Sequence, residues 1–171
     1  MDAVAWYFTQ NLVFVYFFYG LAFFALGLVV LLESGRASEF RFARGLRPLA
    51  WFGLVHGAHE WFEMLQIFAA GQTGYSPGIL EEAIRLGSLI LSFVFLLIFG
   101  TRLLPDAEHD PRASNLQVLT MTLLWMVAVA YVAWRYQPDL KQLFVSADVL
   151  ARYALAIPGS LLAAWALLRE R

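Results

Sequence analysis

Five apolar segments, each about as long as a helix that crosses a lipid bilayer, dominate this sequence of 171 residues. They are Leu12–Leu32, Leu49–Ala70, Ala83–Leu104, Leu116–Trp134 and Ala147–Leu168. A helix of about 20 residues crosses about 30 Å of hydrocarbon, whereas a membrane β-barrel needs alternating segments of about ten residues. The sequence lacks that alternation, so it predicts an all-α, polytopic membrane bundle with five transmembrane helices.

The overall composition agrees with a membrane protein. Hydrophobic residues make up 61% of the chain and charged residues 15%, whereas soluble domains carry about 45–50% and about 25%. A net charge of −1 offers no basic surface for nucleic acid, so we expect membrane lipids as partners and no nucleic acid. The absence of cysteine excludes disulfides, thiolate metal sites and thiol nucleophiles.

The basic residues between the segments predict an orientation. Loops expected on one side carry eight of them, namely Arg36, Arg41, Arg44, Arg47, Arg102, Arg112, Arg169 and Arg171. Leaving aside Arg85 and Arg152 at the helix borders, the other side carries only Arg135 and Lys141. Because basic loops stay in the cytoplasm, we expect the N-terminus outside and the C-terminus in the cytoplasm.

Four ionisable residues share one face of the second segment. His56, His59, Glu60 and Glu63, which we call the His/Glu stripe, are separated by offsets of three, four and seven residues. Such offsets place side chains on one helical face. Each ionisable group costs from about 2.5 kcal/mol upward at bilayer depth, so these groups usually face a bundle interior and mark a site.

Three further charged residues are expected at the same depth. Arg85 lies near the start of the third segment, and Asp148 and Arg152 lie near the start of the fifth. Together with the His/Glu stripe they would line a cavity that opens outward and has more carboxylates than guanidiniums. We expect this excess to leave room for a cation or a polar ligand, with Arg85, Arg152 and Asp148 as ligand-binding residues.

One interpretation of the His/Glu stripe is a divalent transition metal site. Imidazole and carboxylate groups three or four residues apart can bind zinc, iron, manganese or copper. The His-x-x-His-Glu-x-x-Glu spacing differs from the His-Glu-x-x-His motif of zinc proteases. Haem fits less well, because its two axial ligands lie on opposite faces of the iron and both histidines share one helix face. A haem shared in a dimer, or with Met64 as a ligand, stays open.

Two other interpretations stay open beside the metal site. In one, the stripe forms a titratable relay or holds a polar ligand together with Arg85 and Arg152. In the other, the groups are structural: Glu60 pairs with Arg85, Glu63 pairs with Arg152, and the histidines bond to backbone or hydroxyl groups of neighbouring helices.

Two stretches resemble a known family. FFYGLAFFALGLVVLLE (17–33) and LAWFGLVHGAHEW (49–61) are similar to the N-terminal multi-span region of certain bacterial sensor histidine kinases, most strongly over residues 14–65. The resemblance implies a membrane region that precedes cytoplasmic signalling modules and a kinase core. This chain has no phosphoacceptor helix and no ATP-binding segment, so we expect one sensor domain, residues 1–171, from a longer multi-pass protein of the bacterial inner membrane.

The expected function is therefore a transmembrane input domain, working as a homodimer, without a catalytic core of its own. It would bind a metal ion or small ligand in its outer half and signal through the C-terminal helix to downstream cytoplasmic domains. Pro158 and Gly159 would provide a bending point in that helix. The alternatives are a metal-dependent intramembrane hydrolase, with zinc on the two histidines and a stripe glutamate as base, and a small transporter subunit.

Overall fold

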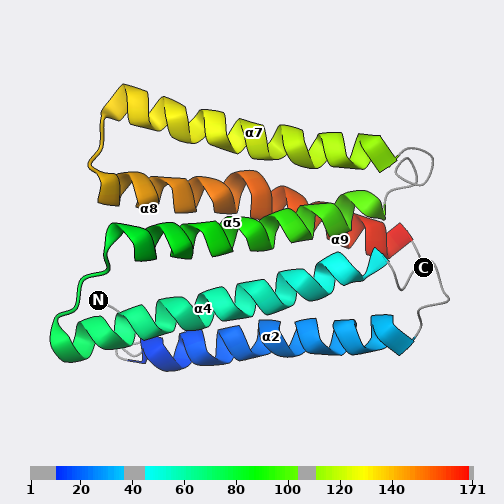
Figure 1. The fold of residues 1–171 in the computed structure, drawn as a ribbon. Coiled ribbons are helices and arrows are strands. Elements are labelled where there is room, and N and C mark those ends of the chain that lie inside the picture. Colours follow the sequence, from blue (N-terminus) through cyan, green and yellow to red (C-terminus); the bar gives the residue numbers. More distant parts are fainter. Residues whose placement is uncertain (1–10, 37–44, 104–110, 170–171) are drawn as a thin grey trace, which may run out of the picture.

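The computed structural model describes residues 11–36, 45–103 and 111–169, and these form helices joined by short connections, with no strand among them. The helices are α2 (Leu12–Arg36), α4 (Arg47–Thr73), α5 (Ile79–Arg102) and α7 (Pro111–Tyr136), followed by one continuous run. This run consists of α8 (Leu140–Ala151), the π-helix η1 (Arg152–Ala156) and α9 (Ile157–Arg169). With this run taken as one, the described residues form five helical rods. They lie side by side, each antiparallel to the one before it in sequence (Figure 1).

Four of the five rods are long and apolar enough to cross a membrane: α2, α5, α7 and the run from α8 to α9. The chain thus has the character of a membrane protein. The helix α4 is equally long, at 27 residues, but is not among the four. Its two histidines, two glutamates and two glutamines lower its hydropathy.

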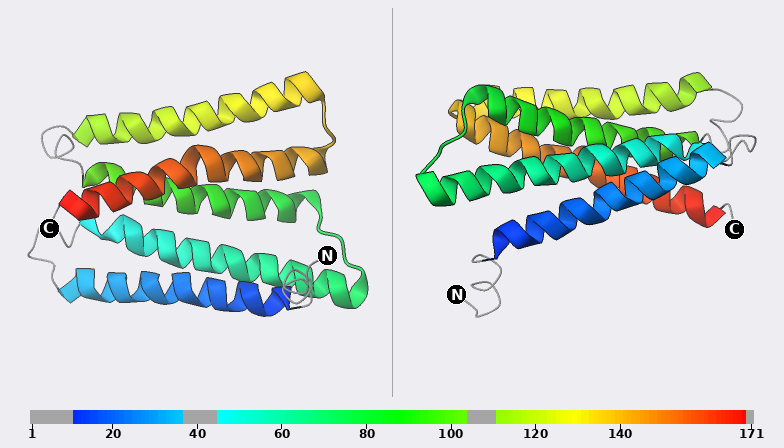
Figure 2. Two further views of the ribbon diagram at one scale, coloured as in Figure 1. Left: turned by 180° about the vertical axis from the view of Figure 1, so that it is seen from behind. Right: turned by 60° about the horizontal axis from the view of Figure 1, so that its bottom comes forward.

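Direct backbone contact joins α2 to α4. A Cβ atom added to Gly57 would lie 2.7 Å from the carbonyl oxygen of Gly20, and one added to Gly53 would lie 2.8 Å from the amide nitrogen of Gly27. Small residues at these crossings allow two membrane helices to approach closely. Figure 2 shows α2 beside α4 at one edge of the bundle and α7 at the other.

The core of the bundle is built around α5. Its fully buried residues Leu89, Leu97 and Phe99 pack in one cluster with Phe52 of α4 and Leu155 of η1. Because α5 contacts α4, α7, α8, η1 and α9, side chains from both halves of the chain meet on it. This central position brings the charged residues of α4, α5 and α8 together.

The fifth rod differs from its predicted form in two ways. It begins at Leu140 rather than Ala147, because Asp139 caps it by accepting a hydrogen bond from the backbone N–H of Gln142 at 2.8 Å. The irregularity expected at Pro158 is a π-helix just before it. Proline has no N–H to donate to the preceding turn, so the backbone there rearranges its hydrogen bonds.

The antiparallel order of the helices also places several basic residues at the same end of the bundle. Arg47, Arg102 and Arg169 lie at helix ends on one end of the bundle, opposite the α4–α5 connection (Figure 1). Arg41, Arg44 and Arg171, which also support the predicted orientation, lie outside the described residues.

Candidate functional site

The two histidines of the His/Glu stripe are buried between α4 and α5 and bond to serines of α5. Nδ1 of His56 lies 3.1 Å from Oγ of Ser92, and Nδ1 of His59 lies 3.0 Å from Oγ of Ser88. Each serine hydroxyl also donates its hydrogen to the carbonyl three residues earlier, at 2.6 and 2.8 Å. Since a hydroxyl has one hydrogen, each histidine must donate from Nδ1 to its serine.

The opposite ring nitrogen of each histidine faces a glutamate one turn along α4. Nε2 of His56 lies 3.4 Å from Oε1 of Glu60, and Nε2 of His59 lies 3.5 Å from Oε2 of Glu63. In a neutral imidazole protonated on Nδ1, Nε2 is an acceptor, and a carboxylate also only accepts. Each His–Glu pair therefore forms a favourable contact only when a proton or another cation lies between nitrogen and oxygen.

Three buried side-chain atoms in this region have no hydrogen-bond partner among the described residues: Nε2 of His59, Oε2 of Glu63 and Nε2 of Gln66. The three residues follow one another at offsets of four and three, so they share one face of α4. A buried polar atom without a partner costs about 1–3 kcal/mol, and native proteins have few of them. Their concentration on one face makes this part of α4 a candidate binding position.

An ion-pair network joins the stripe to the C-terminal run. Nη1 of Arg85 lies 2.8 Å from Oδ2 of Asp148 and 3.7 Å from Oε1 of Glu63, while Nη2 lies 3.0 Å from Oε2 of Glu82. Asp148 also accepts from Nε of Arg152 through Oδ1, at 2.6 Å. Asp148 thus bridges a guanidinium of α5 and one of η1.

This network corrects the structural pairing that the sequence predicted. Arg85 contacts Glu63 rather than Glu60, and the carboxylate paired with Arg152 is Asp148 rather than Glu63. The predicted pairs had the right depth but the wrong partners, because the rotation of α8 brings Asp148 between the two arginines. The expected bonds from histidines to hydroxyl groups of a neighbouring helix are present.

The charges of the cluster do not balance. Four carboxylates, of Glu60, Glu63, Glu82 and Asp148, face two guanidiniums. If all four carboxylates are ionised and both histidines are neutral, two negative charges are left over. Ionic groups away from water are stable only when they are paired, so this excess favours uptake of positive charge. Two protons, one on each His–Glu pair, or one divalent cation would balance it.

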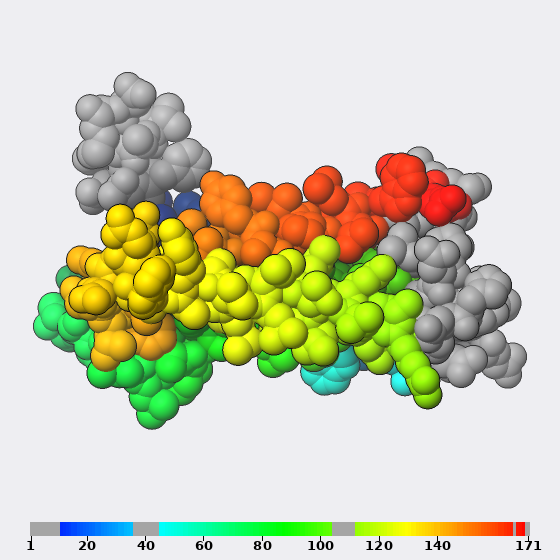
Figure 3. Space-filling model, turned by 90° about the horizontal axis from the view of Figure 1, so that it is seen from above, coloured from blue at the N-terminus to red at the C-terminus, as the bar shows by residue number. Residues whose placement is uncertain are grey.

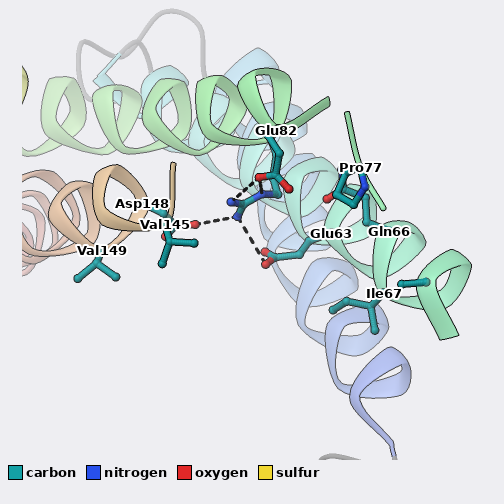
Figure 4. Close-up of a pocket in the computed structure, with 10 residues that line it drawn as sticks. Glu63, Gln66, Ile67, Pro77, Glu82, Val145, Asp148 and Val149 are labelled. Atoms are coloured by element: carbon teal, nitrogen blue, oxygen red, sulfur yellow. Dashed lines mark hydrogen bonds and ion pairs between the residues drawn. The ribbon is translucent and has the colours of Figure 1, made fainter. Parts of the chain in front are cut away.

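Two cavities flank the network. The larger one, of about 470 Å³, lies between α4, α5 and α8 and is lined by Glu63, Gln66, Ile67, Ala70, Pro77, Glu82, Arg85, Val145, Asp148 and Val149. Figure 4 shows Glu63, Glu82 and Asp148 converging from three helices. A second cavity of about 290 Å³ lies between α2, α4 and η1, where Tyr16 and Tyr19 face Glu60 and Arg152.

The stripe is arranged as two His–Glu pairs. The ring centroids of His56 and His59 are 5.9 Å apart, and the described residues contain no group of three or more His, Asp or Glu side chains placed to hold one metal ion. Each pair by itself offers one nitrogen and one oxygen. Binding of a single ion by all four groups would require the side chains to turn toward one another.

Sequence reasoning did not find the serines, Glu82 or Gln66. A signal for the serines was present, since Arg85, Ser88 and Ser92 are spaced by three and four residues and share a face of α5. Gln66 likewise continues the stripe by one turn. Serine and glutamine are uncharged, and membrane helices tolerate them. Neither residue by itself therefore indicates a site.

The arrangement defines a class: a membrane-type helical bundle with a buried, charge-unbalanced cluster between its helices. Comparisons with protein-family models, curated proteins and solved structures find no match for this chain.

Proposed function

We propose that this chain is the transmembrane input domain of a bacterial signalling protein, of the kind found in sensor histidine kinases, and that its buried cluster responds to a cation. One observation carries the proposal. The cluster, in which four carboxylates meet two guanidiniums, is ion-paired to the C-terminal run through Arg85 and Asp148. A change of charge on the stripe can therefore act on the helix that leads toward the C-terminus.

The coupling follows from competition for one guanidinium. Arg85 lies between Glu63 and Asp148, and its contact with Glu63 is the longer one, at 3.7 against 2.8 Å. A cation between His59 and Glu63 would neutralise Glu63 and leave Arg85 to its other two partners. Asp148 and Arg152 would then shift, at the point where the C-terminal run changes from α-helix to π-helix. Such π-helical turns are frequent at functional sites.

The cation in this proposal is a divalent transition metal ion, such as zinc, iron or copper, or a pair of protons. Both supply the positive charge that the cluster lacks. The bonds from histidine Nδ1 to serine leave Nε2 free as a ligand, which is the arrangement that usually orients metal-bound histidines.

We further propose five spans, with the N-terminus outside and the C-terminus in the cytoplasm of the bacterial inner membrane. The helix α4 would span because most of its ionisable groups are buried, with His56, His59 and Glu60 at most 3% exposed. Lipid, or the second subunit of a homodimer, would cover α7, which runs along the face seen in Figure 3. Its Leu124 and Trp134 are 62% and 74% exposed.

The test measures movement of the C-terminal run. The chain has no cysteine, so spin labels on Leu32→Cys and Leu168→Cys, which are exposed on α2 and α9, report one distance by pulsed electron resonance. A shift on adding zinc, iron or copper at fixed pH identifies a metal ion, and a shift on acidification alone identifies protons. Asp148→Asn, which cuts the link, should abolish either shift. An unchanged distance under all these conditions overturns the proposal.

A further inference from the structure

The larger cavity is sized for a small organic molecule. Its volume of about 470 Å³ falls within the range of about 300–1,000 Å³ typical of ligand pockets, whereas one water molecule takes about 30 Å³. Three helices and the connection before α5 form its walls (Figure 4). A bare metal ion or a proton would leave most of this space unused.

The polar groups on α4 lack hydrogen-bond donors. Oε2 of Glu63 and Nε2 of His59 are both unpartnered acceptors, 3.5 Å apart, because the hydrogen of His59 is on Nδ1 and bonds to Ser88. His59 is 1% exposed and does not itself line the cavity, but its free nitrogen faces Glu63, which does. A ligand in the cavity therefore reaches His59 by turning the Glu63 side chain aside. A single group with two or more N–H bonds would satisfy both atoms. The third unpartnered atom, Nε2 of Gln66, is a donor. Turning the amide over puts its oxygen in that place, where it can accept a third N–H.

The charges select a cation. Of the three carboxylates in the cavity, Glu82 and Asp148 each contact Arg85 at 3.0 Å or less, whereas Glu63 has only a contact of 3.7 Å. Glu63 is therefore the carboxylate whose counter-ion is weakest, and it is also the one with an unpartnered oxygen. An anion would meet three carboxylates and a guanidinium that is already engaged.

The remaining walls are apolar. The rest of the lining consists of apolar residues: Ile67 and Ala70 of α4, Pro77, and Val145 and Val149 of α8. Such a lining favours a hydrocarbon body and gives a strongly hydrated ion no contacts.

We infer that the larger cavity binds a primary organic ammonium ion, with its N–H groups on Glu63, His59 and Gln66 and an apolar body against Ile67, Val145 and Val149. The claim that this ligand signals to the C-terminal helix rests on the proposed function, with the ammonium ion as the cation. The claim that it binds in the cavity does not depend on the proposed function.

The test uses the purified full chain and three probes of similar shape: cyclohexylammonium, N,N,N-trimethylcyclohexylammonium and cyclohexanol. Binding is followed by calorimetry at neutral pH. Cyclohexylammonium should bind. The trimethyl compound keeps the charge but has no N–H, and the alcohol keeps the body but has no charge, so each should bind at least about tenfold more weakly. Equal binding of the alcohol or of the trimethyl compound would overturn the inference.

Variants locate the ligand. Glu63→Gln should weaken cyclohexylammonium binding at least about tenfold, because it removes the charge. Glu81→Gln is the matched control, since Glu81 bonds to the backbone N–H of Gly78 and lies outside the cavity lining. If Glu63→Gln does not fold, Ile67→Trp fills the apolar part and should also abolish binding. Unchanged binding in a folded Glu63→Gln or Ile67→Trp variant contradicts the site.

The spin-label distance separates this inference from the proposed function. If an ammonium ion binds without moving α9, and added metal ions and acid also leave the distance unchanged, the ligand site is upheld and the signalling proposal is contradicted. A distance that responds to zinc or acid, in a protein that binds none of the amines, upholds the signalling proposal and overturns the ligand site.

Discussion

Arg85 of α5 and Asp148 of α8, which are 63 residues apart in sequence, are joined by a contact of 2.8 Å between Nη1 and Oδ2. Each residue is 8% exposed, and each has a second charged partner, Glu82 for the arginine and Arg152 for the aspartate. The pair is therefore the middle of a chain of charges that crosses from α5 to the C-terminal run. Removing Asp148 takes from Arg85 its closest partner, and removing Arg85 takes from Asp148 one of its two guanidiniums.

The first prediction concerns that pair. Arg85→Gln should lower the free energy of unfolding by about 3–5 kcal/mol, because it leaves Glu82 and Glu63 without a guanidinium and takes one of two from Asp148. Adding Asp148→Asn should restore part of the loss, since two neutral amides can bond to each other. Denaturant unfolding in detergent measures both variants. Arg135→Gln, at an exposed arginine, is the control, with an expected change within about 0.5 kcal/mol. A loss as small as that control in Arg85→Gln would refute the buried network.

The second prediction concerns the contact of α2 with α4. Gly57→Ala places a Cβ 2.7 Å from the carbonyl oxygen of Gly20, and backbone cannot move aside as a flexible side chain would. Overpacking of this kind costs about 1–3 kcal/mol, measurable as a lower thermal midpoint. The matched control is Gly87→Ala, whose Cβ meets nothing within 4 Å and which should be neutral or slightly stabilising. Equal effects of the two substitutions would contradict the close crossing.

The sequence predicted the five helices well for a simple reason. Hydropathy and length depend on each segment alone, so segments such as Leu12–Leu32 and Leu116–Trp134 could be recognised without knowledge of their neighbours. Burial of His56, His59 and Glu60 followed in the same way, from helical spacing and the cost of exposing such groups to lipid.

Which residues of different helices contact each other could not be predicted in this way. Whether Arg85 meets Glu60 or Glu63 depends on the relative rotation of two helices, and one residue of α-helix turns the face by about 100°. The last rod also starts earlier than predicted, at Leu140, and its π-helix begins at Arg152. Asp148 reaches both Arg85 and Arg152, which no spacing within one segment reveals.

The third prediction concerns the proposed topology. A cysteine at Thr73, which ends α4, should react with a membrane-impermeant thiol reagent in intact cells, whereas a cysteine at Ser38 should react only after lysis. The basic residues at the other end of the bundle are the physical reason. Each variant has a single thiol, because the native chain has none. The opposite labelling pattern would reverse the orientation.

The last prediction concerns Ser88, which holds His59 in one tautomer. Because the Ser88 hydroxyl donates to the carbonyl of Arg85, it can only accept from His59, and Nε2 of His59 is left bare toward Glu63. In Ser88→Ala the ring loses this acceptor, so its hydrogen can move to Nε2 and bond to Glu63 instead. The two unpartnered atoms would then satisfy each other, without any cation.

Ser88→Ala should therefore weaken binding of cyclohexylammonium several-fold while the fold is kept, and Ser88→Thr, which retains a hydroxyl, should preserve it. Ser92→Ala is the matched control, since Ser92 bonds to His56, whose glutamate partner Glu60 faces the smaller cavity. Nitrogen-15 chemical shifts of the imidazole ring report the tautomer directly, and the hydrogen of His59 should move from Nδ1 to Nε2 only in Ser88→Ala. If the shifts show that move and the affinity stays the same, then the bare nitrogen of His59 is no part of the ligand site.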